Sequence, residues 1–296
     1  MNIQLKILTK YLQLLRVKQY IKNVFIFLPS FFAMKFLNYD IQINNIIIFF
    51  SFSLLTSAVY IINDILDRNK DRKHPKKKLR PIASGQVSIR QACILICFIL
   101  FTSLLTASSL NNYQIYLLMG TYFLINILYV FWLKNIGIID VFSIASGFVI
   151  RILIGGVAGE VFINKWILIM TFLLALFLGF AKRRDDFLLM KETGTIIRKS
   201  VEEYNLHFIN ASLFITSSIT LIAYLMYTIS EETISRYNSN NLYITSVFVF
   251  LGILRYLQIT MVKKESGSPT EVLYADRLIQ LSILGWVLSF GFIMYT

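Results

Sequence analysis

The sequence predicts an all-α, polytopic membrane protein. Hydrophobic residues make up 56% of the 296 residues, charged residues only 15%, and the mean hydropathy is +0.66. This composition excludes an ordinary soluble globular domain. The apolar residues also occur in long unbroken runs, whereas a membrane β-barrel needs short segments that alternate between apolar and polar residues. Each run is therefore expected to be a helix.

Runs of about 20 apolar residues can cross a bilayer, and about nine such runs are present. They lie at residues 20–36, 44–66, 90–110, 113–133, 138–158, 162–181, 207–229, 241–262 and 276–295. The first is short, and Pro29 is expected to kink it. Residues 1–19 interleave charges with leucine and isoleucine, which predicts an amphipathic helix at the membrane surface. Because no polar stretch is long enough for a separate soluble domain, residues 1–296 are predicted to form one domain.

The net charge of +13 is concentrated in particular segments between the predicted spans. Lys and Arg gather in the N-terminal segment, at residues 68–80, at residues 182–199 and after the eighth span. Under the positive-inside rule these segments face the cytoplasm, together with the N-terminus. The cations therefore indicate membrane orientation and do not predict a nucleic-acid partner.

A cluster of acidic and amide side chains follows the second predicted span. Its members are Asn63, Asp64, Asp67 and Asp71. At 100° per residue these four fall within about 100° of one another, so they share one helical face. Magnesium prefers such oxygen ligands and usually takes only one or two protein carboxylates. The neighbouring cations are Arg68, Lys78 and Arg80. A magnesium ion that holds a diphosphate fits this combination.

Other polar side chains are candidates for binding anionic groups. They are Lys18, Lys22 and Asn23 near the N-terminus, Tyr129 and Lys134 at the end of the fourth span, Arg151 within the fifth, and Lys182, Arg183, Arg184 and Asp185 after the sixth. Lys18 and Lys22 also fit a pair of snorkelling lysines, and the positive-inside rule accounts for the cations after the sixth span but not for the acids beside them. A charge within a span usually lines a cavity or meets an anion, which favours a functional role for Arg151.

These motifs resemble the UbiA superfamily of intramembrane transferases. The resemblance rests on residues 18–23, 63–85 and 182–185, and the run 267–273 is similar as well. It implies a helical bundle around a cytoplasm-facing cavity, in which the first aspartate-rich motif binds a magnesium diphosphate. Within the superfamily the same runs look like the branch of decaprenyl-phosphate phosphoribosyltransferases.

This branch changes the expected substrates. Ordinary superfamily members carry a second acidic D-x-x-x-D motif, but here Asp185 is followed four residues later by Leu189. The cations at 182–184 suit an additional phosphate better than a second metal. The resemblance thus implies magnesium-dependent transfer of 5-phosphoribose from phosphoribosyl pyrophosphate to a polyprenyl phosphate of decaprenyl type, with release of diphosphate. It further implies a bacterial inner (plasma) membrane and a role in lipid-linked pentose and cell-surface glycan synthesis.

The resemblance also divides the candidate residues by role. It assigns Asp64, Asp67, Lys182 and Arg183 to catalysis, Asn63, Asp64, Asp67 and Asp71 to the metal, and Lys18, Lys22, Asn23, Arg68, Lys78, Arg80, Tyr129, Lys134, Arg151, Arg184 and Asp185 to substrate binding.

Two alternatives stay open. The first is a UbiA-type prenyltransferase that moves a prenyl group from a prenyl diphosphate to an aromatic or other acceptor, and the missing second acidic motif argues against it. The second is a secondary transporter, although transporters usually place their charges near the middle of the bilayer, at broken helices. The family analogy leaves a homo-oligomer open.

Overall fold

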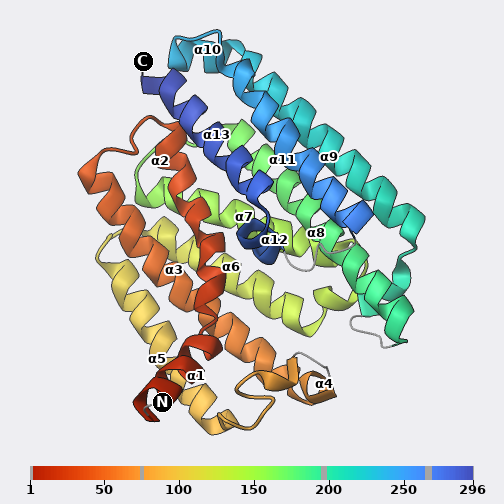
Figure 1. The fold of residues 1–296 in the computed structure, drawn as a ribbon. Helices are drawn as coiled ribbons and strands as arrows, with labels where there is room; N and C mark the ends of the chain where they lie inside the picture. Colours follow the sequence, from red (N-terminus) through yellow and green to blue (C-terminus); the bar gives the residue numbers. More distant parts are fainter. Residues whose placement is uncertain (1–2, 74–76, 195–198, 264–268, 296) are drawn as a thin grey trace. The chain divides into compact units, whose positions relative to one another are not determined.

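The computed structural model describes residues 3–73, 77–194, 199–263 and 269–295, and within these ranges it contains helices and turns but no strand (Figure 1). Two sequence motifs extend beyond the described residues, at positions 74–76 and 267–268. The short elements are α1 (Ile3–Leu14), η1 (Val17–Phe27), α2 (Leu28–Phe32), α4 (Arg68–Lys73), η2 (Lys77–Leu79), η3 (Leu133–Asn135), η4 (Lys199–Glu203), α10 (Glu231–Tyr237) and α12 (Pro269–Ala275).

Eight helices in the described part of the chain are long and apolar enough to cross a membrane. They are α3 (Tyr39–Leu66), α5 (Ile89–Ser108), α6 (Tyr113–Phe131), α7 (Ile139–Ala158), α8 (Lys165–Thr193), α9 (Leu206–Ile229), α11 (Ser246–Gln258) with its flanking turns η5 (Leu242–Thr245) and η6 (Ile259–Lys263), and α13 (Arg277–Tyr295). They match the second to ninth predicted spans closely. The predicted all-α membrane fold is confirmed.

The first predicted span, residues 20–36, takes a different form. It consists of the 3₁₀ helix η1 followed by the single turn α2, which has Pro29 at its start, where a missing N–H costs least. Side chains anchor this segment to α3, because Asn23 Nδ2 donates a hydrogen bond of 2.9 Å to Ser53 Oγ. The segment is therefore shaped by its polar contacts rather than by an uninterrupted α-helical ladder.

Polar caps set several helix boundaries. Asn38 Oδ1 accepts a hydrogen bond from the Ile41 amide at the start of α3, and Ser88 forms a reciprocal capping box with Gln91 at the start of α5. The long helix α8 ends at Gly194, which has a φ of 64° and donates its N–H to the Met190 carbonyl.

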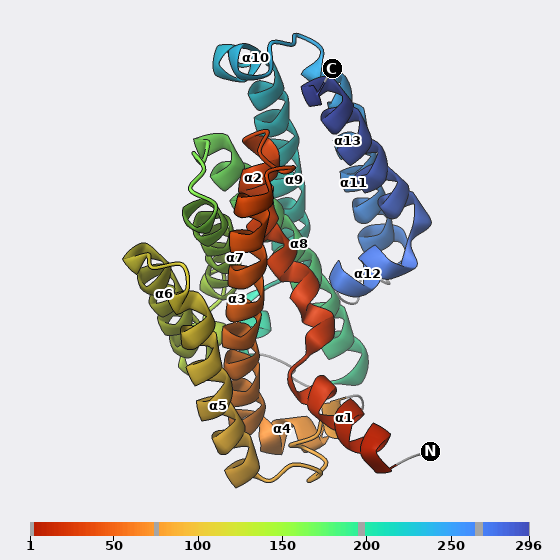
Figure 2. The same ribbon diagram turned by 90° about the vertical axis from the view of Figure 1, so that its left-hand side faces the viewer.

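The helices divide into two compact units, and the single domain expected from the sequence stays a prediction. Unit 1 comprises residues 1–130 and 150–162, and unit 2 comprises residues 131–149 and 163–296, so that α7 contributes to both. In unit 1, α3 packs against α5 and η1 (Figure 2). In unit 2, α8 packs against α9 and α11 packs against α13 (Figure 1).

A glycine permits one close helix contact in unit 1. A Cβ atom at Gly155 would lie only 2.0 Å from the Ile26 carbonyl oxygen, so no other residue allows η1 and α7 to approach this closely. The contact brings the polar residues of η1 beside the part of α7 that carries Arg151.

Candidate active site

Two carboxylates converge on one guanidinium at the C-terminal end of α3. Arg80 Nη1 lies 3.0 Å from an oxygen of Asp64 and 2.6 Å from an oxygen of Asp71. The two acids are buried, whereas the Arg80 side chain is 27% exposed. Arg16 forms a further ion pair with Asp64. These four residues, Asp64, Asp71, Arg16 and Arg80, are called the acid-pair site below.

Buried apolar side chains bring the acid-pair site together. Leu14, Ile61 and Ile82 come from three separate segments, are 0–1% exposed and pack in one hydrophobic cluster. Each lies within three residues of a charged member of the site. Because full burial of such a side chain is worth about 1.5–3 kcal/mol, the cluster fixes the backbone from which the charges project.

The acidic motif does not lie on one uninterrupted helix. α3 ends at Leu66, Asp67 has a ψ of 3°, and α4 begins at Arg68. The Asp67 amide nevertheless donates to the Asn63 carbonyl, and the Asp71 amide donates to the Asp67 carbonyl, at 2.9 and 2.8 Å. The helical spacing thus survives the break, and residues seven apart, Asp64 and Asp71, reach the same arginine.

Arg16 is a member of the site that the sequence analysis did not assign. It lies in the segment predicted to be a surface helix, 48 residues before Asp64. Its φ of 52° is unusual for a residue with a Cβ, and its guanidinium stacks 4.8 Å from the centre of the Tyr60 ring. A non-glycine residue in this conformation costs on the order of 1–3 kcal/mol, which its contacts with Asp64 and Tyr60 offset. No local sequence signal marks Arg16, because its partners are distant in the chain.

The two carboxylates of the acid-pair site, Asp64 and Asp71, can supply part of the ligand shell of a magnesium ion. Asp64 and Asp71 present two oxygens to the same nitrogen, so their carboxylates are close enough to share a cation. Across the part of the chain that the structure describes, three or more His, Cys, Asp or Glu side chains do not converge anywhere. A pair of carboxylates is what magnesium usually takes from a protein when substrate phosphates and water complete its shell. Asn63 and Asp67 lie half-buried in the same segment, and their predicted role as ligands stays a prediction.

A second polar group in unit 1 contains Lys22, Asn23, Tyr122 and Arg151 and is called the Lys22–Arg151 group below. Arg151 is 4% exposed. Its Nε donates to Asn23 Oδ1 at 2.8 Å, and its Nη2 donates to the Tyr122 hydroxyl at 3.1 Å. The guanidinium also lies 5.4 and 5.1 Å from the ring centres of Phe52 and Tyr122. The structure therefore brings together Asn23 and Arg151, two predicted residues 128 positions apart, and adds Tyr122, which the sequence analysis did not assign.

Lys22 extends the positive charge of this group. Its electrostatic neighbours include two cations, Arg151 and Arg16, and the hydroxyl of Tyr129, which is another predicted site residue. Like charges at close range repel each other strongly where water is scarce. This part of unit 1 therefore gathers several basic side chains.

Arg183, predicted to meet an anionic substrate, is instead enclosed by acids in unit 2. Its side chain is 0% exposed, its Nε lies 2.6 Å from Asp140 and its Nη1 lies 2.5 Å from Asp186. Asp140 also accepts hydrogen bonds from Ser200 and Tyr204, at 3.1 Å each. Burial raises the pKa of the Tyr204 phenol, so this hydroxyl stays protonated and donates. These residues are called the Arg183 network.

The other predicted residues of unit 2 differ in burial and contacts. Arg184 is 5% exposed and donates to Asn210 Oδ1 at 3.0 Å and to the Thr260 carbonyl at 2.5 Å. Lys134, Lys182 and Asp185 are half-buried. In unit 1, Arg68 is half-buried in α4, whereas Lys18 and Lys78 are exposed.

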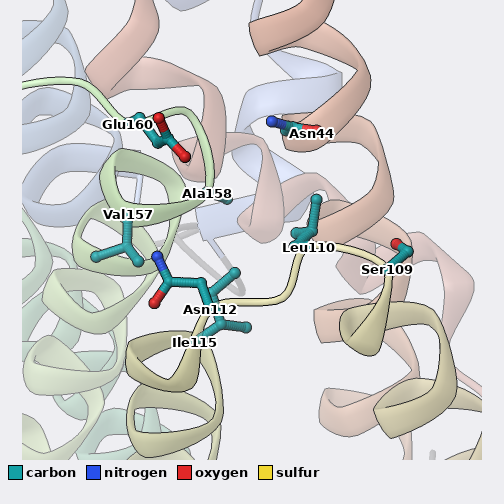
Figure 3. A pocket seen from close by; sticks show the side chains of 8 residues that line it. All are labelled: Asn44, Ser109, Leu110, Asn112, Ile115, Val157, Ala158 and Glu160. Carbon is teal, nitrogen blue, oxygen red and sulfur yellow. The ribbon is translucent and has the colours of Figure 1, made fainter.

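A polar cavity of about 150 Å³ lies in unit 1, but it contains none of the predicted residues (Figure 3). Its lining consists of Asn44, Ser109, Leu110, Asn112, Ile115, Val157, Ala158 and Glu160. Asn44 and Asp64 are separated along α3 by about 30 Å, since a helix rises 1.5 Å per residue. The cavity is therefore separate from the acid-pair site.

Residues 24–191, more than half of the chain, match the model of the UbiA prenyltransferase family. The chain belongs to this family. The match includes α3, the acidic motif at residues 63–71 and the part of α8 that carries Arg183. The protein is thus an integral, multi-pass membrane transferase of the UbiA family.

Solved structures of UbiA homologues share the fold. One from Archaeoglobus fulgidus, bound to DMAPP and Mg²⁺, aligns with a TM-score of 0.73 at 22% identity, covering 97% of this chain and 100% of that one. The same homologue bound to GPP and Mg²⁺ aligns with a TM-score of 0.71 at 21% identity, over 97% and 100% of the two chains.

Curated relatives extend over nearly the whole chain. The decaprenyl-phosphate phosphoribosyltransferase of Mycolicibacterium smegmatis is 28% identical over 95% of this chain and 91% of its own length. The enzyme of the same name from Corynebacterium glutamicum is 28% identical over 95% and 85% of the two chains.

Proposed function

We propose that this UbiA-family transferase moves 5-phosphoribose from phosphoribosyl pyrophosphate to a polyprenyl phosphate and releases diphosphate. The observation that carries the proposal is the pairing, within unit 1, of the acid-pair site with the cationic Lys22–Arg151 group. The first offers carboxylates for a metal diphosphate, and the second offers positive charge for a further phosphate. Two curated relatives that span nearly the whole chain carry the name of this activity.

The donor's diphosphate is assigned to the acid-pair site. Asp64 and Asp71 would hold magnesium, with Asn63 and Asp67 beside them, and Arg16 and Arg80 would turn from the acids to the diphosphate oxygens. When bound, magnesium neutralises charge on the departing diphosphate. The arginines suit this exchange because a guanidinium binds carboxylate and phosphate with the same fork of donors.

The acceptor needs little help from a general base. An oxygen of the polyprenyl phosphate forms the new bond to C1 of the ribose while the bond from C1 to the diphosphate breaks, and diphosphate leaves with that electron pair. The attacking oxygen is already anionic near neutral pH, so the chain's task is to hold two anions against their mutual repulsion. In unit 1 the cations assigned to phosphate groups are Lys18, Lys22 and Arg151. The resemblance to the family adds Lys182 and Arg184 of unit 2 as predicted substrate-binding residues.

Arg183 is assigned a positioning role. Its enclosure by Asp140 and Asp186 leaves its charge neutralised, so it would act by orienting the end of α8 that carries Lys182 and Arg184. This differs from the direct phosphate contact expected from the sequence.

The location and pathway follow from the same proposal. The cation-rich segments favour a cytoplasmic N-terminus and a cytoplasmic active site in a bacterial inner membrane. The product would then supply lipid-linked pentose for a cell-surface glycan.

The test is transfer of label into lipid. Membranes that contain the protein receive phosphoribosyl pyrophosphate labelled in its ribose, polyprenyl phosphate and magnesium, and the label is counted in the organic phase. We expect lipid-borne label that disappears with EDTA, and an Asp67→Asn variant that loses turnover by about a thousandfold while it still reaches the membrane. A folded wild-type protein that labels no lipid, or one that prenylates an aromatic acceptor from prenyl diphosphate, would overturn the proposal.

A further inference from the structure

We infer that the polar cavity of unit 1 binds a primary ammonium group, of the kind that the headgroup of an aminophospholipid carries. The inference is independent of the proposed transfer reaction, because the cavity contains none of the residues assigned to that reaction. Half of its lining is apolar, and the polar half consists of Asn44, Ser109, Asn112 and Glu160 (Figure 3). Such a lining suits a polar group that is attached to a lipid.

The cavity lies where four long helices begin or end. α5 ends at Ser108 and α7 at Ala158, while α3 begins at Tyr39 and α6 at Tyr113. All four are long and apolar enough to cross a membrane, so their ends reach the bilayer surface, where lipid headgroups lie. The volume of about 150 Å³ is several times the roughly 30 Å³ that one water molecule occupies in the liquid. A short polar chain such as ethanolammonium therefore fits.

Glu160 occupies a backbone position that usually belongs to glycine. The Val161 amide donates to the Gly156 carbonyl at 3.0 Å. The Glu160 amide donates to the Val157 carbonyl at 3.3 Å, which completes the Schellman arrangement at the end of α7. Glu160 has the positive φ that this arrangement requires, 51°, and a residue with a Cβ adopts it at a conformational cost. The chain thus keeps a carboxylate at the cavity although glycine would end the helix with less strain.

The charge around the cavity favours a cation. The carbonyl end of a helix carries a partial negative charge, and both α5 and α7 end here. Glu160 adds a full negative charge beside the end of α7. The opposite, positive end of α6 is capped by Asn112 Oδ1, which accepts a hydrogen bond of 2.9 Å from the Gln114 amide. No Lys, Arg or His occurs in the three segments that supply the lining, residues 36–67, 91–133 and 152–164.

A primary ammonium group matches the cavity better than other cations do. It has three N–H donors, and the cavity offers oxygen atoms of Glu160, Asn44 and Ser109. Ser109 Oγ donates to the Thr106 carbonyl at 2.9 Å, so its lone pairs are available to a donor. A quaternary ammonium has no N–H to donate. Calcium as a rule binds through several carboxylates, and the cavity has one.

The experiment compares three phospholipids with the same acyl chains on the delipidated full chain in detergent. Phosphatidylethanolamine carries the primary ammonium, phosphatidylcholine carries the same charge without N–H donors, and phosphatidylglycerol carries no ammonium. Native mass spectrometry measures the bound lipid. We expect phosphatidylethanolamine to bind about tenfold more tightly than either of the others. Equal binding of phosphatidylethanolamine and phosphatidylcholine would overturn the inference.

Soluble amines identify the source of the ammonium group. Ethanolamine and glycerophosphoethanolamine carry the same amine without acyl chains. If neither displaces phosphatidylethanolamine at equal concentration, the ligand is the lipid headgroup, as inferred. Displacement at equal concentration would support the ammonium chemistry and overturn the lipid as its source.

A change of one atom in the carboxylate tests the role of Glu160. Glu160→Gln keeps the size of the side chain and removes its charge, so the preference for phosphatidylethanolamine over phosphatidylcholine should fall from about tenfold to about twofold or less. The matched control is Asp40→Asn, an exposed acid in the first turn of α3 that does not line the cavity, and it should keep the preference. A Glu160→Gln protein that keeps the full preference would overturn the inference.

Glu160→Gly gives a readout in the opposite direction. Glycine adopts a positive φ without strain, so this variant should melt at a higher temperature than the wild type in lipid-free detergent while it loses the preference for phosphatidylethanolamine. A variant that retains the preference would contradict the inference whatever its stability. Because Glu160 has no assigned part in phosphoribosyl transfer, the lipid-binding and label-transfer experiments can fail separately.

Discussion

Two clusters of arginine and aspartate, one in each unit, are built from the same residue types and differ in exposure to water. In the acid-pair site Arg16 and Arg80 are 22% and 27% exposed. In the Arg183 network both Arg183 and Asp140 are 0% exposed. A partly hydrated guanidinium can exchange a carboxylate for a phosphate at little cost, whereas a fully buried pair cannot separate without stranding a charge in a low dielectric. The first cluster is therefore suited to ligand binding and the second to holding helices in place.

The backbone explains why exposure differs. α3 stops at Leu66 and the chain turns through the short helix α4, so the acids lie where the chain changes direction. α8 instead continues without a break to Thr193, and Arg183, which lies ten residues before this end, is fully buried. A helix end offers charges to a ligand, while a continuous helix offers them to its neighbours.

The largest expected effect is on catalysis. Asp64→Asn removes the negative charge that both Arg16 and Arg80 contact, and turnover should fall by about a thousandfold or more, since a catalytic metal contributes several kcal/mol. Label transfer in membranes measures it. The matched control is Asp40→Asn, an exposed acid in the first turn of the same helix, which should retain activity. Equal activity of both variants would remove Asp64 from the site.

The next effect is on stability. Asp140→Ala removes one of the two carboxylates around the buried Arg183 and takes away the acceptor that Ser200 and Tyr204 share, so it should destabilise the protein by about 1–3 kcal/mol, seen as an earlier thermal transition in detergent. Asp64→Asn should shift this transition much less, because the arginines around it remain partly hydrated. Similar shifts for the two variants would abolish the distinction between the clusters.

A smaller effect concerns the metal. Arg80 neutralises Asp64 and Asp71 when no ligand is bound, so Arg80→Gln should leave two carboxylates facing each other and tighten Mn²⁺ binding about threefold to tenfold without donor. The same variant should raise the KM for phosphoribosyl pyrophosphate. Titration followed by electron paramagnetic resonance measures the affinity, and an unchanged Mn²⁺ affinity would show that Arg80 does not compete with metal.

The smallest effect belongs to a surface ion pair in unit 2. Arg255 Nη2 lies 2.7 Å from Asp276 Oδ2, and the hydrogen bond from Arg255 lowers the pKa of Asp276. The stability from this pair is present above the ordinary pKa of an aspartate and is lost as the pH falls through the lowered pKa. Asp276→Asn should therefore melt slightly below the wild type near neutral pH, and the two should converge in acid. A difference in melting temperature between Asp276→Asn and the wild type that does not change with pH would contradict this assignment.

Much of the fold was predictable because lipid imposes strong local rules. Apolar runs of spanning length became helices at nearly the predicted positions, from residues 44–66 to residues 276–295. The exception, residues 20–36, contains Pro29 and a set of polar side chains that find partners on α3, which hydropathy does not register. The spacing of Asp64 and Asp71 also survived, since seven residues return to the same helical face.

The sequence by itself determined the all-α membrane architecture, the spacing of the acidic motif and the presence of unusual charges such as Arg151. Local composition and helical periodicity are sufficient for these features, because each depends on residues within a few turns of one another. The tertiary structure alone decided which residues the charged side chains contact. It brings Arg16 into contact with Asp64, which lies 48 residues later in the sequence, and Arg151 into contact with Asn23, which lies 128 residues earlier. It also encloses Arg183 between two acids. The energy of a charge depends on its solvation and its nearest neighbours, and packing between distant segments sets both.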